Sequence, residues 1–245
     1  MTAINNINLA SNKTATEEKT LDTLAASPLF GSISRGDLAG MLNCLKPKTA
    51  TYEKSSYIAV EGEPFTGLGI LTAGQASVIK ETIAGTRTIL TVLEPGDMFG
   101  EMVAFAACQS WPASVVAQTA CAAVFLPPDK IVGGCASACP SHRQLTKNML
   151  SILSERALRL HRKVEYLTIK SMRAKIATYL LEQYKTARKA TFLLPLSRDS
   201  LADFLNVSRT ALSREMGRMR DEGLLEFYRS SVKLKDIDGL KKFLE

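Results

Sequence analysis

The chain has 245 residues, of which 46% are hydrophobic and 22% charged, and this apolar content excludes fibrous and fully disordered classes. No run reaches the roughly 18 apolar residues of a membrane-spanning helix, and residues 1–27 lack the apolar stretch of a signal peptide, so we expect a cytoplasmic protein with no membrane partner. Residues 1–140 hold 9 Lys or Arg and 12 Asp or Glu, a net charge of −3, whereas residues 141–245 hold 22 and 12, a net charge of +10. This asymmetry predicts that the C-terminal part binds a polyanion, with a solvated basic face as the alternative.

A polar N-terminal tail over residues 1–27 is followed by a predicted β-rich domain over residues 28–139. Residues 37–45 (DLAGMLNCL) favour a short amphipathic helix. From Ala50 to Phe125, short runs such as GLGILTAG and ASVIKET alternate with Gly, Pro and Asp. This punctuation is typical of an all-β sandwich or roll, and we predict a β-roll of roughly eight strands.

Residues 140–168 are predicted to form one long helix. Apolar residues recur there at steps of three and four, with Lys and Arg between them. A helix with such a stripe either packs along its own domain or pairs with the same helix of a second chain. We favour a homodimer, and we assign its dimerisation contacts to Leu145, Met149, Ile152, Leu153, Leu160 and Val164.

Residues 169–245 predict a second, helical domain. The pattern indicates helices over 172–185, 199–205 and 209–222, then two short strands near 224–227 and 232–234. Ser197 and Ser208 are the expected N-caps of the second and third helices. Two short helices joined by a tight turn and followed by a basic hairpin form the pattern of a winged helix-turn-helix. The predicted fold class is therefore α+β.

The helix after Ser208 is the predicted recognition helix. In a helix-turn-helix the first turns of this helix reach base edges in the major groove of DNA. An Arg fork matches the two acceptors of guanine, and a hydroxyl serves several bases. The candidate DNA-binding residues are Ser208, Arg209, Thr210, Ser213 and Arg214. Ordinary exposed residues or phosphate contacts are the alternative for the two arginines.

Two segments resemble one known family. LSRDSLADFLNVSRTALSREMGRMRDEGLLEF is similar to the C-terminal helix-turn-helix of the cyclic-AMP receptor protein and fumarate-nitrate regulator (CRP/FNR) family of transcription factors. The segment that ends in GDMFGE, residues 96–101, resembles the cyclic-nucleotide-binding β-roll of that family. The resemblance spans residues 28–240, in the family's order of β-roll, dimerisation helix and winged helix.

The resemblance implies roles for residues of the recognition helix. Arg209 and Arg214 match family positions that contact guanines, and Ser213 matches a base-contacting serine of the fumarate-nitrate branch. Thr210 stands where many members carry a Glu that reads the half-site, which leaves the operator sequence open. A palindrome with a G in each half remains the expectation.

The same resemblance implies an effector pocket in the roll. Cyclic-AMP-binding members carry a Glu for the ribose and an Arg-Ser pair for the phosphate. Glu101 is retained, but Trp111 and Pro112 stand in place of the Arg and the Ser of this phosphate clamp. An anionic phosphate would therefore be left without its partners. The segment from Met102 to Trp111 offers an apolar wall instead. Either this wall lines a pocket for a less charged, aromatic molecule, or Phe105 and Trp111 fill core space and the pocket is vestigial. The candidate effector-binding residues are Gly100, Glu101, Met102, Phe105, Trp111 and Pro112.

The cysteine and histidine content favours neither a disulfide scaffold nor a metal site. Five scattered cysteines fit a reducing compartment, and the spacing of Cys135 and Cys139 lacks the second ligand pair of a structural zinc site. No cysteine precedes Cys44, whereas the iron–sulfur branch of the family needs an N-terminal cysteine cluster. His142 and His161 keep a haem- or redox-responsive regulator as an alternative, with haem less favoured.

These patterns predict a homodimeric transcription regulator controlled by a small effector other than cyclic AMP. The expected partners are double-stranded DNA, a second copy of the chain and, for an activator, RNA polymerase. No cofactor is identified and no motif of an enzyme is present, so an enzyme with a regulatory β-roll is the weaker alternative.

Overall fold

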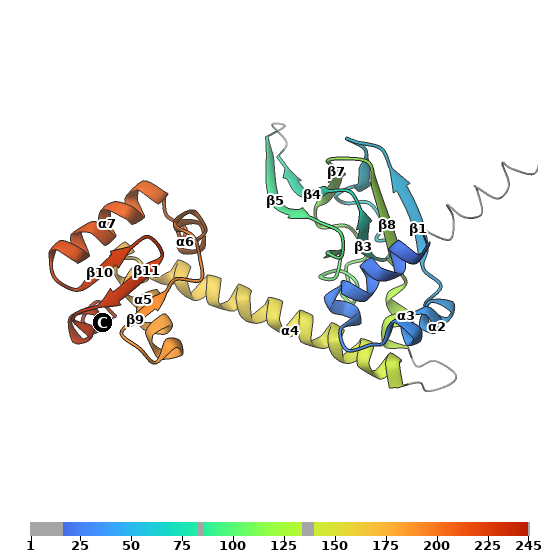
Figure 1. Ribbon diagram of the computed structural model, residues 1–245. Helices are drawn as coiled ribbons and strands as arrows, with labels where there is room; N and C mark the ends of the chain where they lie inside the picture. Colours follow the sequence, from blue (N-terminus) through green and yellow to red (C-terminus); the bar gives the residue numbers. More distant parts are fainter. Residues whose placement is uncertain (1–16, 83–85, 134–139, 245) are drawn as a thin grey trace, which may run out of the picture. The chain divides into compact units, whose positions relative to one another are not determined.

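The computed structural model describes residues 17–82, 86–133 and 140–244 (Figure 1). The chain forms two compact units, of which the first ends at Glu155 and the second begins at Arg156. This division falls inside helix α4 (Pro140–Thr168). In the part of the chain that the structure describes, no helix is both long and apolar enough to cross a membrane.

The first unit contains the predicted β-roll, made of two four-stranded antiparallel sheets. Their strand orders are β1-β8-β3-β6 and β2-β7-β4-β5, and Ala50 pairs with Ala123 in the first sheet. Pro95 and Gly96 form one of the turns expected from the sequence, with a φ of 98° at the glycine. The strands are β1 (Lys48–Tyr52), β2 (Tyr57–Ala59), β3 (Leu68–Ala73), β4 (Ala76–Glu81), β5 (Arg87–Leu93), β6 (Met98–Phe99), β7 (Ser114–Ala117) and β8 (Cys121–Leu126).

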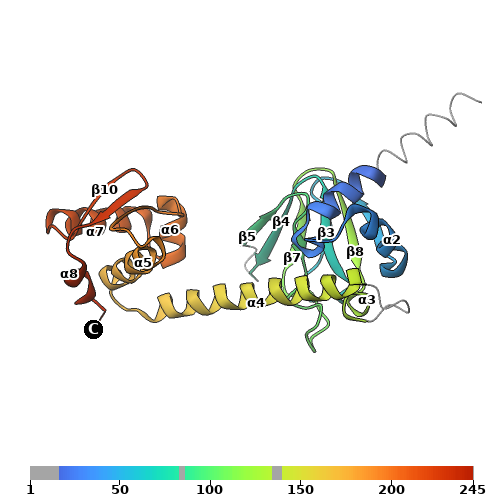
Figure 2. The same ribbon diagram turned by 60° about the horizontal axis from the view of Figure 1, so that its bottom comes forward.

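Alternate residues of β3 and β8 face two separate cores. Leu71 and Phe125 belong to an apolar cluster that includes residues of both sheets. Ile70 and Val124 point to the opposite face, where helices cover the first sheet (Figure 2). These helices are η1 (Pro28–Phe30), α2 (Arg35–Leu45), α3 (Pro128–Val132) and the first turns of α4.

Residues 17–26, within the predicted polar tail, form a further helix against this core. Leu24 is 1% exposed, and Leu21 and Ala25 pack beside it. The helix is amphipathic but carries only one narrow apolar stripe, so its mixed polar composition resembles that of a tail.

Part of the predicted dimerisation surface, in the first turns of α4, is wrong. Leu145 and Met149 are 0% and 1% exposed, because they insert into the helix-covered core of their own unit. Ile152 and Leu153 are partly buried against the same core. Leu145 and Met149 are therefore intrachain core residues and have no surface left for a partner.

The second unit is the predicted winged helix. One apolar core unites its helices and a three-stranded antiparallel sheet of order β10-β11-β9. No pattern in the sequence predicted β9 or the last helix. The elements are α5 (Met172–Ala187), β9 (Thr191–Leu193), α6 (Arg198–Leu205), α7 (Arg209–Asp221), β10 (Leu225–Tyr228), β11 (Ser231–Leu234) and α8 (Ile237–Lys241).

Candidate DNA-binding surface and effector site

A tight, capped turn joins α6 to α7. Asn206 ends α6 in the left-handed conformation with a φ of 55°, which short polar side chains tolerate. The hydroxyl of Ser208 accepts a hydrogen bond from the backbone N–H of Ala211 at 3.2 Å. The equivalent cap of α6 is Ser197, whose hydroxyl accepts from the N–H of Ser200. The sequence had predicted both caps, and they fix where each helix begins.

The two faces of α7 differ in burial as a recognition helix requires. Leu212, Met216 and Met219 are fully buried in the core of the second unit. The five candidate DNA-binding residues lie on exposed surface at the start of the helix: Ser208, Arg209, Thr210, Ser213 and Arg214. Arg209 forms an ion pair of 3.2 Å with Asp199 of α6, but both side chains are about two-thirds exposed and water screens the pair.

A buried carboxylate that no local sequence pattern indicates anchors α7 to α5. Glu215 is 7% exposed, and one of its oxygens accepts a hydrogen bond of 2.6 Å from Arg173. The same guanidinium donates two hydrogen bonds to Glu222, just after α7. Hydrogen bonding to these two carboxylates raises the pKa of Arg173. Helical periodicity predicts that Glu215 lies beside the buried face of α7, which includes Met216. It does not predict that Arg173 of another helix pairs with this carboxylate.

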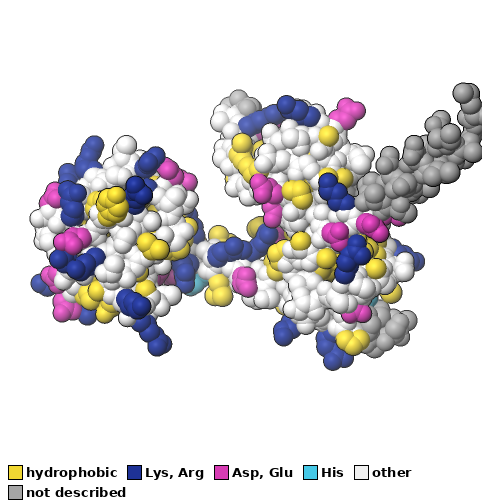
Figure 3. Space-filling model, in the orientation of Figure 1, with side chains coloured by type: hydrophobic (Ala, Val, Ile, Leu, Met, Phe, Trp, Pro, Cys, Tyr) yellow, Lys and Arg dark blue, Asp and Glu magenta, His cyan; other side chains and the backbone are white. Residues whose placement is uncertain are grey.

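Arginine side chains lie over the aromatic rings of the hairpin after α7. The guanidinium groups of Arg198 and Arg220 lie 5.0 and 5.6 Å from the centre of the Phe227 ring. At the hairpin turn, Arg229 lies 5.4 Å from the ring of Tyr228, which is 73% exposed. Lys and Arg side chains are prominent on the visible surface of this unit (Figure 3).

In the β-roll, Trp111 is a core residue. It is 4% exposed and belongs to the cluster that includes residues of both sheets. Its ring centre lies 4.8 Å from that of Phe65 and 6.0 Å from that of Phe99. Of the two alternatives at this position, the packing favours the one in which the indole fills core space.

The other candidate effector residues divide between the interior and the surface. Gly100 has a φ of 83°, and a Cβ there would lie 2.7 Å from the Trp111 ring, so only glycine fits. Glu101 is 4% exposed, whereas Met102 and Phe105 are 68% and 41% exposed. The backbone carbonyl of Pro112 accepts a hydrogen bond from Lys80. The predicted apolar wall is thus split: Trp111 points inward, and Met102 and Phe105 face solvent.

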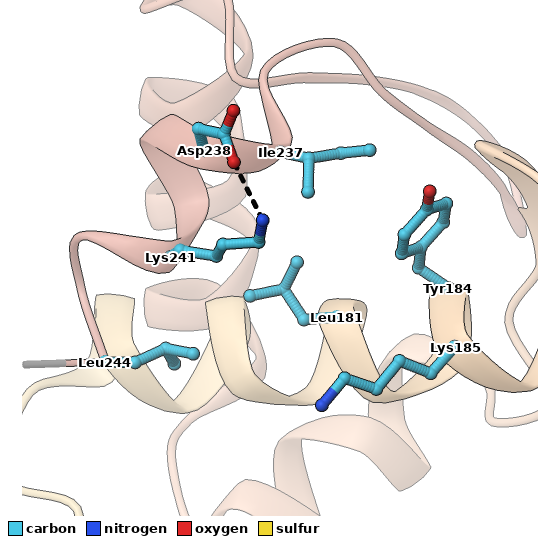
Figure 4. A pocket seen from close by; sticks show the side chains of 7 residues that line it. All are labelled: Leu181, Tyr184, Lys185, Ile237, Asp238, Lys241 and Leu244. Atoms are coloured by element: carbon cyan, nitrogen blue, oxygen red, sulfur yellow. Dashed lines mark hydrogen bonds and ion pairs between the residues drawn. The ribbon is translucent and has the colours of Figure 1, made fainter.

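A cavity of about 470 Å³ that the sequence did not suggest lies between α5 and α8 (Figure 4). An ion pair of 2.8 Å between Asp238 and Lys241 flanks it, and this contact raises the pKa of the exposed lysine. Its lining residues are Leu181, Tyr184, Lys185, Ile237, Asp238, Lys241 and Leu244. None of the candidate DNA-binding residues is among them.

The two histidines differ in their surroundings. His142 is 7% exposed in the first turn of α4, and His161 is exposed and lies 3.3 Å from Glu165. Among the described residues, no group of three or more His, Cys, Asp or Glu side chains could hold a metal ion. Cys135 and Cys139 lie outside the described residues.

Two family models match the chain in the order of its units. Residues 49–137 match the cyclic nucleotide-binding domain, and residues 174–243 match the Crp-like helix-turn-helix domain. Together they account for about two thirds of the sequence.

A curated relative and several solved structures align with most of the chain. The CRP-like cAMP-activated global transcriptional regulator of Mycobacterium tuberculosis is 21% identical over 228 residues, which is 90% of this chain and 98% of the relative. The catabolite activator protein of Thermus thermophilus has the same fold, with a TM-score of 0.51 and 20% identity over 89% of this chain and 98% of the other. DNR from Pseudomonas aeruginosa aligns with a TM-score of 0.43 and 22% identity over 91% of this chain and 96% of that structure. The two domain matches, in this order on one chain, show that the protein belongs to the CRP/FNR family of DNA-binding transcription regulators.

Proposed function

We propose that the protein is a homodimer that binds a palindromic operator and responds to a small effector other than cyclic AMP. The observation that carries the proposal is the apolar surface of α4. Leu150, Leu160 and Val164 are 60%, 62% and 50% exposed, although a helix of a monomer would normally bury such residues.

Apolar residues of α4 between Leu150 and Leu167 follow a heptad pattern; Leu153 among them is partly buried in the first unit, and the exposed Leu158 lies outside the pattern. Successive steps of three and four residues link Leu150, Leu153, Ala157, Leu160, Val164 and Leu167. These steps are the a and d spacing of a two-stranded coiled coil. A second copy of α4 would cover this stripe, hereafter called the seam, and its pairing would present two recognition helices to one DNA duplex.

The recognition helices would read DNA through the exposed start of α7. Arg214 is the strongest candidate for a bidentate contact with guanine, since no ion pair within the described ranges involves it. Arg209 would contact either a base or a phosphate once its ion pair with Asp199 is broken. The hydroxyls of Thr210 and Ser213 can hydrogen-bond to several different bases. Two identical subunits predict two inverted half-sites about 34 Å apart.

The effector proposal rests on the interior of the roll. The relative from Mycobacterium tuberculosis is named as cAMP-activated, but here the indole of Trp111 packs against Phe65 and Phe99. An anionic phosphate in this cluster would lose its hydration without gaining a cationic partner. We therefore assign control to a less charged molecule that contacts Met102 and Phe105, the exposed apolar side chains of the same segment. Its binding would shift the pairing of the seam and hence the affinity for the operator.

Selection of bound sequences from random duplexes, together with analytical ultracentrifugation, tests the dimer and the operator. We expect a dimer and an enriched sequence with inverted repeats that contain G. A monomer, or enrichment of a sequence without inverted symmetry, would refute the proposed dimer. Titration calorimetry with cyclic AMP tests the effector proposal, for which saturable binding at micromolar concentration would be the contrary result.

A further inference from the structure

Within the second unit, two lysines neutralise the C-terminal end of helix α6. Lys163, near the end of α4, donates hydrogen bonds to the carbonyls of Asp203 and Phe204, the latter at 2.6 Å. Lys175 of α5 is 8% exposed and donates to the carbonyl of Leu205 at 3.0 Å. The last carbonyls of a helix lack partners within the helix and carry its negative dipole end, so both ammonium groups stabilise this terminus.

Aromatic packing reinforces the contact between α4 and α6. Tyr166 is 1% exposed, and its ring centre lies 4.8 Å from that of Phe204 and 6.5 Å from that of Tyr179. The ammonium of Lys163 lies 5.6 Å from the centre of the same Phe204 ring. Partial burial lowers the pKa of Lys163. The last turns of α4 are thus built into the core of the DNA-binding unit.

The heptad position of Lys163 places this contact beside the seam. If Leu160 and Val164 occupy positions d and a, Lys163 occupies position g, which flanks the seam. Lysines at this position commonly pair with a carboxylate of the partner helix. Here the ammonium group binds α6 of its own chain, one tight turn away from Ser208 and the start of the recognition helix.

We propose that Lys163 is a positioning residue that fastens α6 to the end of α4, so that the part of the seam in the second unit (Leu160, Val164 and Leu167) moves as one block with the recognition helix. The inference rests on the proposed dimer, because a rigid block fixes the distance between two recognition helices only when two seams pair. Free rotation between α4 and α6 would leave each helix-turn-helix able to bind one half-site. It would remove the benefit of binding both half-sites together, which depends on matching their spacing.

The test compares Lys163→Met, which keeps the aliphatic stem, with Arg159→Met, which removes the same charge from an exposed position of α4. The probes are the palindrome selected by the wild-type protein and a duplex with only one of its half-sites. We expect Lys163→Met to remain dimeric and to bind the single half-site with an affinity within about twofold of that of Arg159→Met. Its affinity for the palindrome should be at least about tenfold lower than that of Arg159→Met. Lys163→Arg should restore part of the palindrome affinity, because a guanidinium can also donate to the carbonyls.

Three results separate the interpretations. Equal palindrome affinity of Lys163→Met and Arg159→Met would overturn the positioning role. An equal loss on the palindrome and the half-site would overturn it as well, because it would indicate a phosphate contact or a damaged fold. A monomeric wild-type protein would refute the proposed dimer, and ultracentrifugation detects this before any variant is compared.

Amide hydrogen exchange without DNA tests directly whether Lys163 fastens α6. The backbone amides of residues 203–208 should exchange several-fold faster in Lys163→Met than in the wild-type protein, and at the wild-type rate in Arg159→Met. Equal exchange rates in the two variants would refute the positioning role.

Discussion

Replacement of Trp111 by alanine distinguishes a core indole from the wall of an open effector pocket. A tryptophan buries roughly 150–250 Å² on folding, and at about 25 cal/mol per Å² this area is worth roughly 4–6 kcal/mol. Truncation of buried aromatic residues costs about 3–5 kcal/mol in measured series. Because Trp111 is 4% exposed and packs at 4.8 Å from Phe65, we expect Trp111→Ala to lose about 3–5 kcal/mol of unfolding free energy.

Urea unfolding followed by far-ultraviolet circular dichroism measures this loss at a fixed protein concentration. The matched control is Phe105→Ala in the same segment, whose side chain is 41% exposed and whose loss should be about 1 kcal/mol or less. A loss of under about 1.5 kcal/mol for Trp111→Ala would refute the reasoning, because such tolerance is typical of a side chain beside an open cavity.

Three further predictions concern α7 and α4. Arg214→Ala should cost about 1–3 kcal/mol on the selected operator and little on random duplex, as measured by fluorescence anisotropy; an equal loss on both would assign Arg214 to phosphate. Leu160→Glu should give monomers in ultracentrifugation, whereas Leu158→Glu, at an equally exposed position outside the seam, should leave the dimer intact. Glu215→Gln should lower the unfolding free energy by about 1–3 kcal/mol, because Arg173 loses a charged acceptor; an unchanged urea midpoint would show that Glu222 alone satisfies it.

Local sequence signals were sufficient to predict features that depend only on neighbouring residues of the chain. The Gly, Pro and Asp punctuation predicted an eight-stranded roll, and the serine caps marked the starts of α6 and α7. Both follow from backbone geometry that a few neighbouring residues determine. The helix over residues 17–26 was missed because its stability comes from Leu24 in a distant core.

The long helix shows why burial partners were harder to predict. Periodicity identifies every apolar position of α4 but not the surface that covers each one. Leu145 and Met149 pack in their own unit, whereas Leu160 and Val164 remain exposed. Contacts such as Lys163 with α6 depend on carbonyls about 40 residues away in the sequence, and no local pattern reports them.

The last prediction concerns the double change Trp111→Arg with Pro112→Ser, which would recreate the phosphate clamp implied by the family resemblance. The side chain at position 111 packs against Phe65 and Phe99, and Gly100 contacts the indole so closely that a Cβ there would collide with it. A guanidinium in this cluster would leave a buried charge among aromatic rings, which costs several kcal/mol unless an anion enters with it. We therefore expect the variant to be destabilised in urea and to show no saturable heat with cyclic AMP. Micromolar binding that also restores the unfolding free energy would contradict this expectation, because the ligand phosphate would then be supplying the missing anion. The single change Pro112→Ser is the control: Pro112 is exposed, so its replacement should alter neither stability nor cyclic-AMP binding.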